Sequence, residues 1–298
     1  MRACSLVAAT ILAGSTLAPA KSAHAAPAQT NAIEIEYVVP KDARHRTIYE
    51  RLKEHRVLER LQQLLSPFRL PRKLTVKVEG CDGEINAWYE NDAVTVCYEY
   101  LDYVWRNAFK RTKFEGAAQV DVLLGPVFDV FLHEFGHAVF DVLDVPLFVR
   151  EEDAADSFAA YIMLHFGKAE ARRLILGTAY AYKLEDEEPP EKSGMARFAD
   201  EHGTPAQRFY NLLCIAYGAQ ADLFADLVKK GYLPKDRAEG CAGEYTQVRK
   251  AFQRLISPHI DLTLAKEVMD RDWLPDPATK MRAPPVPKRD TRRPPSAR

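Results

Sequence analysis

The chain has 298 residues, of which 47% are hydrophobic and 28% are charged, and its formal net charge is −1. So even a balance argues against nucleic acid as the main partner, because nucleic-acid-binding domains carry a basic surplus. Without the signal peptide and the C-terminal tail predicted below, about 250 residues remain for the folded part. This is enough for one sizeable core without a second domain.

The first 25 residues have the features of a secretory signal peptide. Arg2 is followed by an apolar stretch over 6–17 and then by Ala23-His24-Ala25, a small-residue cleavage pattern. The stretch is too short to span a bilayer as a helix. We therefore predict an exported protein without stable membrane insertion, in the periplasm or the medium. Its mature chain has 39 basic and 42 acidic residues.

Four cysteines remain after removal of the signal, namely Cys81, Cys97, Cys214 and Cys241. An even number in an oxidising compartment suggests two disulfides, although four cysteines allow three pairings and buried free thiols are the alternative. We favour Cys81 with Cys97 and Cys214 with Cys241, because each pair closes a modest local loop.

The first part of the mature chain is rich in strand patterns. Alternating apolar residues predict a strand over 33–39, and one apolar face predicts a helix over 44–65. Three more strands are expected at 74–78, 85–89 and 94–98, with a turn at 90–92 between the last two. These strands predict a small antiparallel or mixed sheet.

Helical patterns dominate from residue 100 onward. They predict helices over 100–111, 118–143, 150–166, 168–184, 205–217, 220–230 and 243–256. The expected fold class is therefore α+β, with one domain over 26–274 that is strand-rich over 32–99 and helical over 100–274. The remainder, 275–298, has seven prolines and seven Lys or Arg, which predicts a disordered basic tail.

An HExxH motif lies inside the apolar helix expected at 118–143. His133 and His137 are four residues apart, so both imidazoles point from one helix face toward a common ion. Glu134 is rotated by roughly 100° and can reach a water molecule at that ion without binding the ion itself. The alternative is that both histidines are ordinary polar residues of a partly exposed helix.

Catalytic zinc generally takes three protein ligands. A histidine third ligand would need Gly and His at positions 140 and 143, which are Phe140 and Leu143. Pro146 ends the helix, and a second helix beginning near 150 brings Glu152 back beside His137. We expect Glu152 as the ligand rather than its neighbour Glu151, because only Glu152 stands in an ExxxD register with a second acid.

That second acid is Asp156, which is expected to accept the ring N–H of a ligand histidine. Acidic residues are also common in the first turn of a helix, because the helix dipole stabilises negative charge there. This is the alternative explanation for residues 151–153. With zinc in place, Glu134 would act as the general base, taking a proton from water and passing it to the leaving amine. Hydrolysis of peptide bonds is the expected reaction, and a peptide or protein is the expected substrate.

HExxH followed by ExxxD resembles the gluzincin type of zinc metallopeptidase, which implies a zincin-like fold. A broader resemblance over about 80–220 is to a bacterial family of unknown function described as putative metallopeptidases. It rests on the segments Cys81, Asn86-Ala87-Trp88-Tyr89, Cys97-Tyr98-Glu99, HEFGH, EEDAAD, Asp200-Glu201-His202 and Gln207-Arg208-Phe209-Tyr210-Asn211. The resemblance implies the ligands, the base and the orienting Asp156.

Two further roles follow from these resemblances. His202 or Tyr210 would stabilise the oxyanion of the reaction, and we expect His202. Trp88 and Tyr89 would line a cleft where substrate adds to the sheet edge, with core packing as the alternative. Two other functions remain open, namely a catalytically inactive binding module in the cell envelope and an exported metal-binding protein without a peptide partner. The oligomeric state is not predicted.

Overall fold

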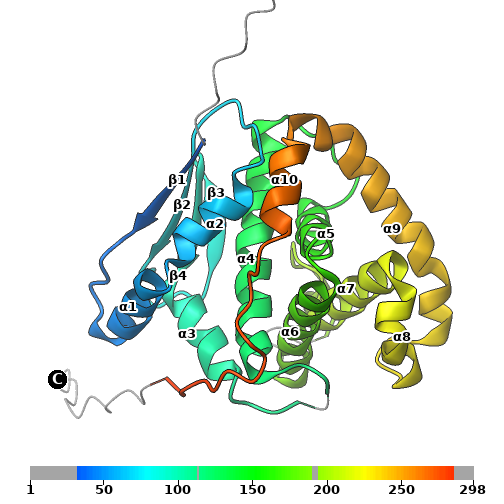
Figure 1. Cartoon of the computed structure of the whole chain (residues 1–298). Helices are drawn as coiled ribbons and strands as arrows, with labels where there is room; N and C mark the ends of the chain where they lie inside the picture. The colour runs from blue at the N-terminus through cyan, green and yellow to red at the C-terminus, as the bar shows by residue number, and fades with distance from the viewer. Residues whose placement is uncertain (1–31, 113, 190–193, 285–298) are drawn as a thin grey trace, which may run out of the picture. The chain divides into compact units, whose positions relative to one another are not determined.

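The computed structural model describes residues 32–112, 114–189 and 194–284. The predicted signal peptide over 1–25 lies outside these residues, as does the part of the predicted tail over 285–298. Four strands near the start of the described chain are followed by a mainly helical region, as Figure 1 shows. The fold class is α+β, as predicted, whereas the domain boundaries remain a prediction.

The sheet is mixed and has the strand order β1-β2-β4-β3. Its strands are β1 (Ile33–Tyr37), β2 (Leu74–Glu79), β3 (Ala87–Glu90) and β4 (Ala93–Cys97). The pairs β1/β2 and β2/β4 are parallel, and β3 pairs antiparallel with β4. Asn91 and Asp92 form the two-residue turn between β3 and β4 with φ of 52° and 58°, as a tight hairpin requires. The strand β3 is therefore an edge strand.

The prediction of one continuous helix over 44–65 is wrong, because the structure has two helices there. A short 3₁₀ turn (Ala43–His45) leads into α1 (Arg46–Glu54), and α2 (Val57–Leu65) follows after a break. At the break Arg56 has a left-handed backbone with φ of 51°. The backbone N–H of Leu58, in the first turn of α2, donates to the hydroxyl of Tyr37 at 2.8 Å. Anchoring to β1 thus sets the new helix direction, which the apolar periodicity of the segment does not reveal.

Eight α-helices follow in the rest of the described chain. They are α3 (Tyr98–Asn107), α4 (Gln119–Val142), α5 (Glu151–Met163), α6 (Lys168–Glu187), α7 (Pro205–Ala219), α8 (Ala221–Lys229), α9 (Lys235–Leu255) and α10 (Leu262–Met269). The helix α9 begins eight residues before the predicted start, because packing on α7 overrides the low helix propensity of Gly240 and Gly243. The helix α10 was not predicted.

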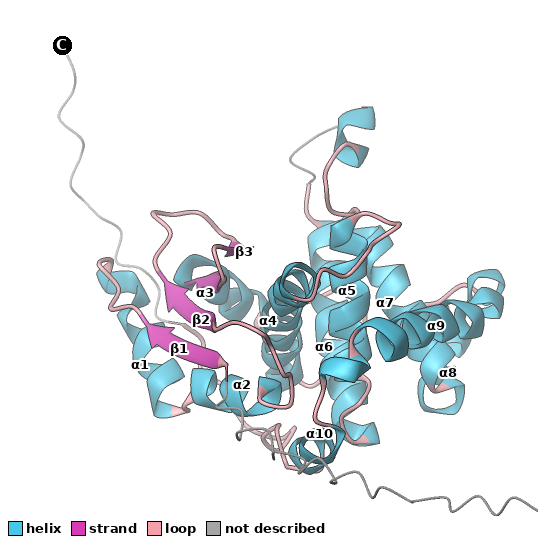
Figure 2. Cartoon of the chain, turned by 90° about the horizontal axis from the view of Figure 1, so that it is seen from above, coloured by secondary structure: helices cyan, strands magenta, loops and turns pink. Residues whose placement is uncertain are grey.

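The helix α4 is the central element of the fold. Figures 1 and 2 show it between the sheet on one side and α5 and α6 on the other, and it contacts all of them. A Cβ added to Gly177 of α6 would lie 1.9 Å from the backbone oxygen of Asp121, so α4 and α6 cross at backbone distance. Among the described residues, only α4 is long and apolar enough to cross a membrane, and 67% of that stretch is buried inside the protein. Core helices commonly have such a composition.

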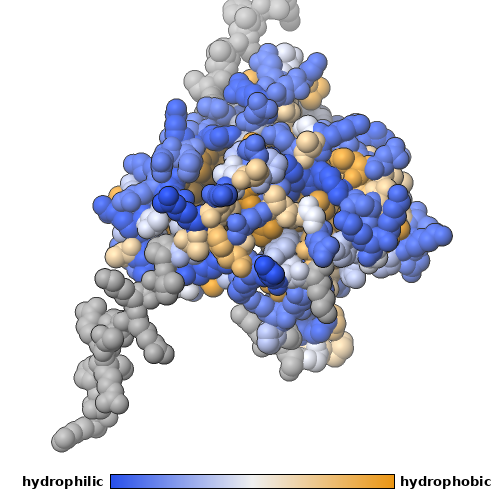
Figure 3. Space-filling model, turned by 60° about the horizontal axis from the view of Figure 1, so that its bottom comes forward, coloured by the Kyte–Doolittle hydropathy of each residue, from blue (hydrophilic) through white to orange (hydrophobic). Residues whose placement is uncertain are grey.

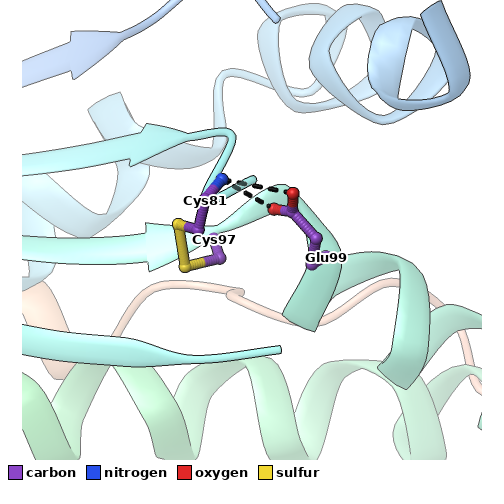
Figure 4. Close-up of side chains that lie close together, drawn as sticks. All are labelled: Cys81, Cys97 and Glu99. Carbon is purple, nitrogen blue, oxygen red and sulfur yellow. Dashed lines mark hydrogen bonds between the residues drawn. A yellow bond between two sulfur atoms is a disulfide. The ribbon is translucent and has the colours of Figure 1, made fainter. Parts of the chain in front are cut away.

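Both predicted disulfides are confirmed. Cys81 is joined to Cys97 at the end of β4, and Cys214 of α7 is joined to Cys241 of α9. Beside the first bridge the carboxylate of Glu99 accepts the backbone N–H of Cys81 at 3.0 Å, as Figure 4 shows. It also accepts the backbone N–H of Gly83 at 3.0 Å. The acid thus stabilises the loop after β2. Two disulfides indicate folding in an oxidising environment.

Candidate active site

The HExxH segment lies in the C-terminal half of α4, and α5 packs across it. His133 and Glu134 are buried, and His137 is half-buried. A Cβ added to Gly136 would lie 3.4 Å from the Cα of Ala155 in α5. The small residues on both helices therefore let the first turn of α5 come close to the two imidazoles.

Three donor atoms from these helices converge. The Nε2 atoms of His133 and His137 lie 3.1 Å apart, and the Glu152 Oε2 lies 2.9 Å from the first and 3.4 Å from the second. Zinc–nitrogen bonds of about 2.0–2.1 Å in a tetrahedral site place neighbouring donor atoms about 3.3 Å apart. The spacing of the three atoms therefore fits a tetrahedral metal ion.

A carboxylate lies on the outer nitrogen of each imidazole. The Nδ1 of His133 is 2.8 Å from Asp156 Oδ1, and the Nδ1 of His137 is 2.8 Å from Glu151 Oε1. A carboxylate at Nδ1 keeps the ring proton there and leaves the Nε2 lone pair facing inward. Glu151 thus lies behind His137, whereas Glu152 lies between the two inner nitrogens.

The electrostatics of this cluster favour a positive charge. Burial alone would lower the pKa of His133, but hydrogen bonds with Asp156 and Glu152 raise it to about 9. Burial would raise the pKa of Glu152, yet its hydrogen bonds with His133, His137 and His202 bring that pKa far below the usual range. The carboxylates thus favour a proton on His133. A metal cation at the centre of the cluster would supply the positive charge in place of that proton.

Glu134 lies in the same helix with an environment unlike that of Glu152. Only 7% of its surface is exposed, and burial raises the pKa of its carboxyl, while the nearby His133 and His137 act in the opposite direction. A carboxylate whose proton affinity is raised by burial is better suited to take up and return a proton than an exposed one.

Arg208 of α7 holds Asp156 from behind, a contact that the sequence did not reveal. Its Nε and Nη2 donate to the two carboxylate oxygens at 2.8 and 2.6 Å, and its guanidinium lies 4.5 Å from the ring centre of Tyr182. The Tyr182 hydroxyl donates to Asp129 at 2.7 Å. A capping box of Thr204 and Gln207 sets the start of α7. This capping box is a signal in the sequence that could have placed Arg208 in the first turn of the helix.

Asp129 makes the stability of the protein depend on pH. Burial and the nearby charge of Asp156 raise its pKa to about 6, whereas an unfolded aspartate titrates near 3.9. Between these two pH values the folded state retains a proton that the unfolded state loses, so stability falls as pH rises. The loss is on the order of 3 kcal/mol, because one pKa unit corresponds to about 1.4 kcal/mol.

Asp129→Asn removes this titration and still accepts the Tyr182 hydroxyl. We expect the variant to gain stability relative to wild type when the pH is raised from 4.5 to 7. Urea unfolding of both proteins at the two pH values, with chelator present, measures this difference. A constant difference between the two proteins would show that Asp129 titrates normally in the folded state.

The other predicted site residues lie at different distances from the cluster. The Nε2 of His202 is 2.7 Å from Glu152 Oε2, and its ring stacks on that of His133 with centroids 5.7 Å apart. The donor atoms of His133, Glu152 and His202 all lie within 4.8 Å of one another. Tyr210 is exposed and its ring contacts Phe209, so the structure does not bring it to the donors.

The two aromatic residues predicted to line a cleft lie on β3. Trp88 is half-buried, and nothing in the described contacts joins it to the donors. The Tyr89 hydroxyl donates to Asp141 Oδ2 at 2.6 Å, and Arg72 also pairs with that carboxylate. Since Asp141 lies one turn beyond His137 on α4, this contact holds the edge strand beside the helix that carries the histidines.

Comparison with known protein families finds a match. Residues 37–256 match the model of a family described as putative metallopeptidase. The chain belongs to this family. The matched range contains the whole donor cluster with Asp156, His202 and Arg208, and membership indicates a peptidase-like metal protein. No curated protein and no solved structure matches the chain.

Proposed function

We propose that the protein is a zinc-dependent peptidase of the gluzincin type, with His133, His137 and Glu152 as the metal ligands. The observation that carries this proposal is the convergence of their three donor atoms at separations of 3.1, 2.9 and 3.4 Å. Two histidines and one carboxylate are a common ligand set of hydrolytic zinc sites. Family membership supports a metal and a peptidase-like role.

Zinc bound by these residues supplies a Lewis acid that acidifies water and polarises a carbonyl group. Glu134 accepts the proton of the attacking water and returns it to the leaving amine, which its buried carboxyl suits. His202 donates a hydrogen bond to the oxygen on which negative charge develops. Asp156 and Glu151 hold the proton on Nδ1 of the two ligand histidines, so that both inner nitrogens remain unprotonated.

The setting of this activity is also part of the proposal. The signal peptide over 1–25 would export the chain to the periplasm or the medium, which agrees with the two disulfides. A peptide or protein is the proposed partner, without nucleic acid and without stable membrane insertion.

Metal analysis of the purified protein tests the proposal. Wild type should contain zinc near one equivalent and cleave a mixed peptide library, and 1,10-phenanthroline should abolish cleavage until zinc is restored. His137→Ala should lose most of the zinc, because a ligand is removed and Glu151 loses its partner. A matched His165→Ala variant should keep the metal. It removes an imidazole that is hydrogen-bonded to the backbone oxygen of Tyr161 instead of lying at the donor cluster. Full zinc binding by His137→Ala would contradict the ligand set.

The position of His202 favours a second candidate function, a binding module without catalysis. Its Nε2 lies 2.7 Å from Glu152 Oε2, close enough to act as a fourth donor and close the site. Closed four-ligand zinc sites are structural. His202→Ala discriminates between the two functions, and zinc affinity and peptide cleavage are both measured. The peptidase predicts slower cleavage with unchanged zinc affinity, and the binding module predicts weaker zinc binding with no cleavage by wild type.

A further inference from the structure

Exposed apolar side chains occur in the two segments that lead to Glu152 and His202. Of the eight large hydrophobic residues that are exposed among those described, four lie in two short segments, within seven residues of Glu152 or His202 in the sequence. Phe148 and Val149, in the loop between α4 and α5, are 102% and 62% exposed, and Met195 and Phe198, in a 3₁₀ turn over Gly194–Phe198, are 82% and 50% exposed. We call these four residues the apolar rim.

The rim belongs to the same two segments that deliver site residues. Phe148 and Val149 directly precede Arg150, and Glu152 follows in the first turn of α5. Phe198 and Met195 precede His202 by four and seven residues, with Asp200 between them and His202. Arg150 Nη1 donates to the backbone oxygen of Asp200 at 3.5 Å, so the two segments touch beside the donor cluster.

Exposure alone does not assign a role to the rim. Single apolar side chains are common on protein surfaces, and the face in Figure 3 also shows small apolar groups among mainly hydrophilic residues. Several large apolar side chains around one site, by contrast, indicate a surface that binds something. Their place in the two segments that carry Glu152 and His202 indicates what that is.

The surroundings of the rim favour a polypeptide over a membrane. Three exposed acids stand beside it, namely Glu151, Asp200 and Glu201. Of the two arginines there, Arg150 is paired with Asp153 at 2.9 Å and Arg197 lies 4.7 Å from the ring centre of Phe198. The acids outnumber the arginines, and anionic lipid headgroups repel acids. On the sheet side, Tyr89 and Asp141 hold the edge strand β3 along the same end of α4, and an edge strand pairs with an extended chain.

We propose that the apolar rim binds bulky apolar side chains of an extended polypeptide, on both sides of the bond to be cleaved. This inference rests on the proposed function and adds the substrate class to it. Phe148 and Val149 contact the chain on the α5 side of the donors, and Met195 and Phe198 contact it on the His202 side. Large apolar residues near the scissile bond are therefore the specificity determinants, and polar sequences are poor substrates.

Peptide binding tests the rim without requiring turnover. The full-length zinc-loaded protein carrying Glu134→Gln is titrated into a fluorescein-labelled decapeptide with Leu and Phe at its centre, and into a matched peptide with Ser and Thr there. Fluorescence anisotropy should show at least about tenfold tighter binding of the apolar peptide, since burial of one large apolar side chain is sufficient for such a ratio. Adding Phe148→Ser and Phe198→Ser should remove that preference.

Val39→Ser is the matched control, because Val39 is 58% exposed in the loop after β1 and lies outside the two segments. It should leave both affinities unchanged. Equal affinities of the unsubstituted rim for the two peptides would overturn the proposal. Two other results would also overturn it if no peptide preference accompanied them. One is binding to phosphatidylglycerol vesicles that the rim substitutions abolish, and the other is a dimer in sedimentation experiments that they abolish.

Cleavage by the wild-type protein separates this inference from the proposed function. Preferential binding of the apolar peptide by Glu134→Gln, with no cleavage by zinc-loaded wild type, would leave the rim as a polypeptide-binding surface and refute the peptidase. Cleavage of apolar and polar peptides at equal rates would support the peptidase and refute the rim.

Discussion

Glu134→Gln is expected to reduce peptide hydrolysis by about 10²–10⁴-fold, the usual contribution of a general base, and to leave zinc bound at one equivalent. The glutamine has the same size as the glutamate, so it fills the same buried position in α4. It cannot accept a proton, however, and the donor atoms of His133, His137 and Glu152 are untouched. Rates with a cleavable peptide, measured beside zinc content, check both parts of the expectation.

A charge-matched control separates the loss of a base from a loss of charge. Glu50→Gln removes a carboxylate from the exposed surface of α1 and should leave both the rate and the zinc content unchanged. If Glu134→Gln hydrolysed peptides at the wild-type rate, Glu134 would not be the base. If it lost zinc instead, Glu134 would be supporting the metal ligands rather than the reaction.

Local patterns in the sequence predicted most elements of the fold. The apolar stripe of α4, the helix end before Pro146 and the hairpin turn at Asn91 and Asp92 are determined by neighbours within a few residues, so periodicity and turn chemistry reveal them. The order β1-β2-β4-β3 was not predictable in this way. It depends on parallel pairing of strands about forty residues apart, as with Ile33 and Leu74.

In the candidate site too, contacts between residues close in sequence were predictable, and contacts between distant residues were not. The histidines and Glu152 share a short segment of two helices, and their spacing alone indicated that they would meet. Arg208 and Asp156 are separated by 52 residues in sequence, and Tyr182 and Asp129 by 53. Those contacts arise from the packing of α7 and α6 against α4 and α5, which no local period encodes. The break at Arg56 was missed for the same reason, since a distant strand anchors α2.

Arg208→Met is expected to weaken zinc binding by about 10–100-fold, although Arg208 touches no metal ligand. Its two hydrogen bonds fix the carboxylate of Asp156, which in turn holds the Nδ1 proton of His133. Removing one partner of a buried ion pair also destabilises the fold, by about 3–5 kcal/mol. Competition with a zinc-binding dye measures the affinity, and urea unfolding measures the stability.

Arg172→Met is the matched control, because Arg172 of α6 pairs with Asp226 of α8 at a similar distance, 2.8 Å. It should affect stability alone. Arg208→Lys keeps the charge but not the paired geometry of the two donors, so its zinc affinity should fall between those of wild type and Arg208→Met.

A double-mutant cycle decides whether Arg208 acts through Asp156. If it does, Asp156→Asn already removes the carboxylate that Arg208 orients, and adding Arg208→Met should cost little further zinc affinity. Additive losses would mean that Arg208 supports the site by another route, through the ring of Tyr182 and the Asp129 that it binds. Wild-type zinc affinity in Arg208→Met would show that His133 is held in place without this pair.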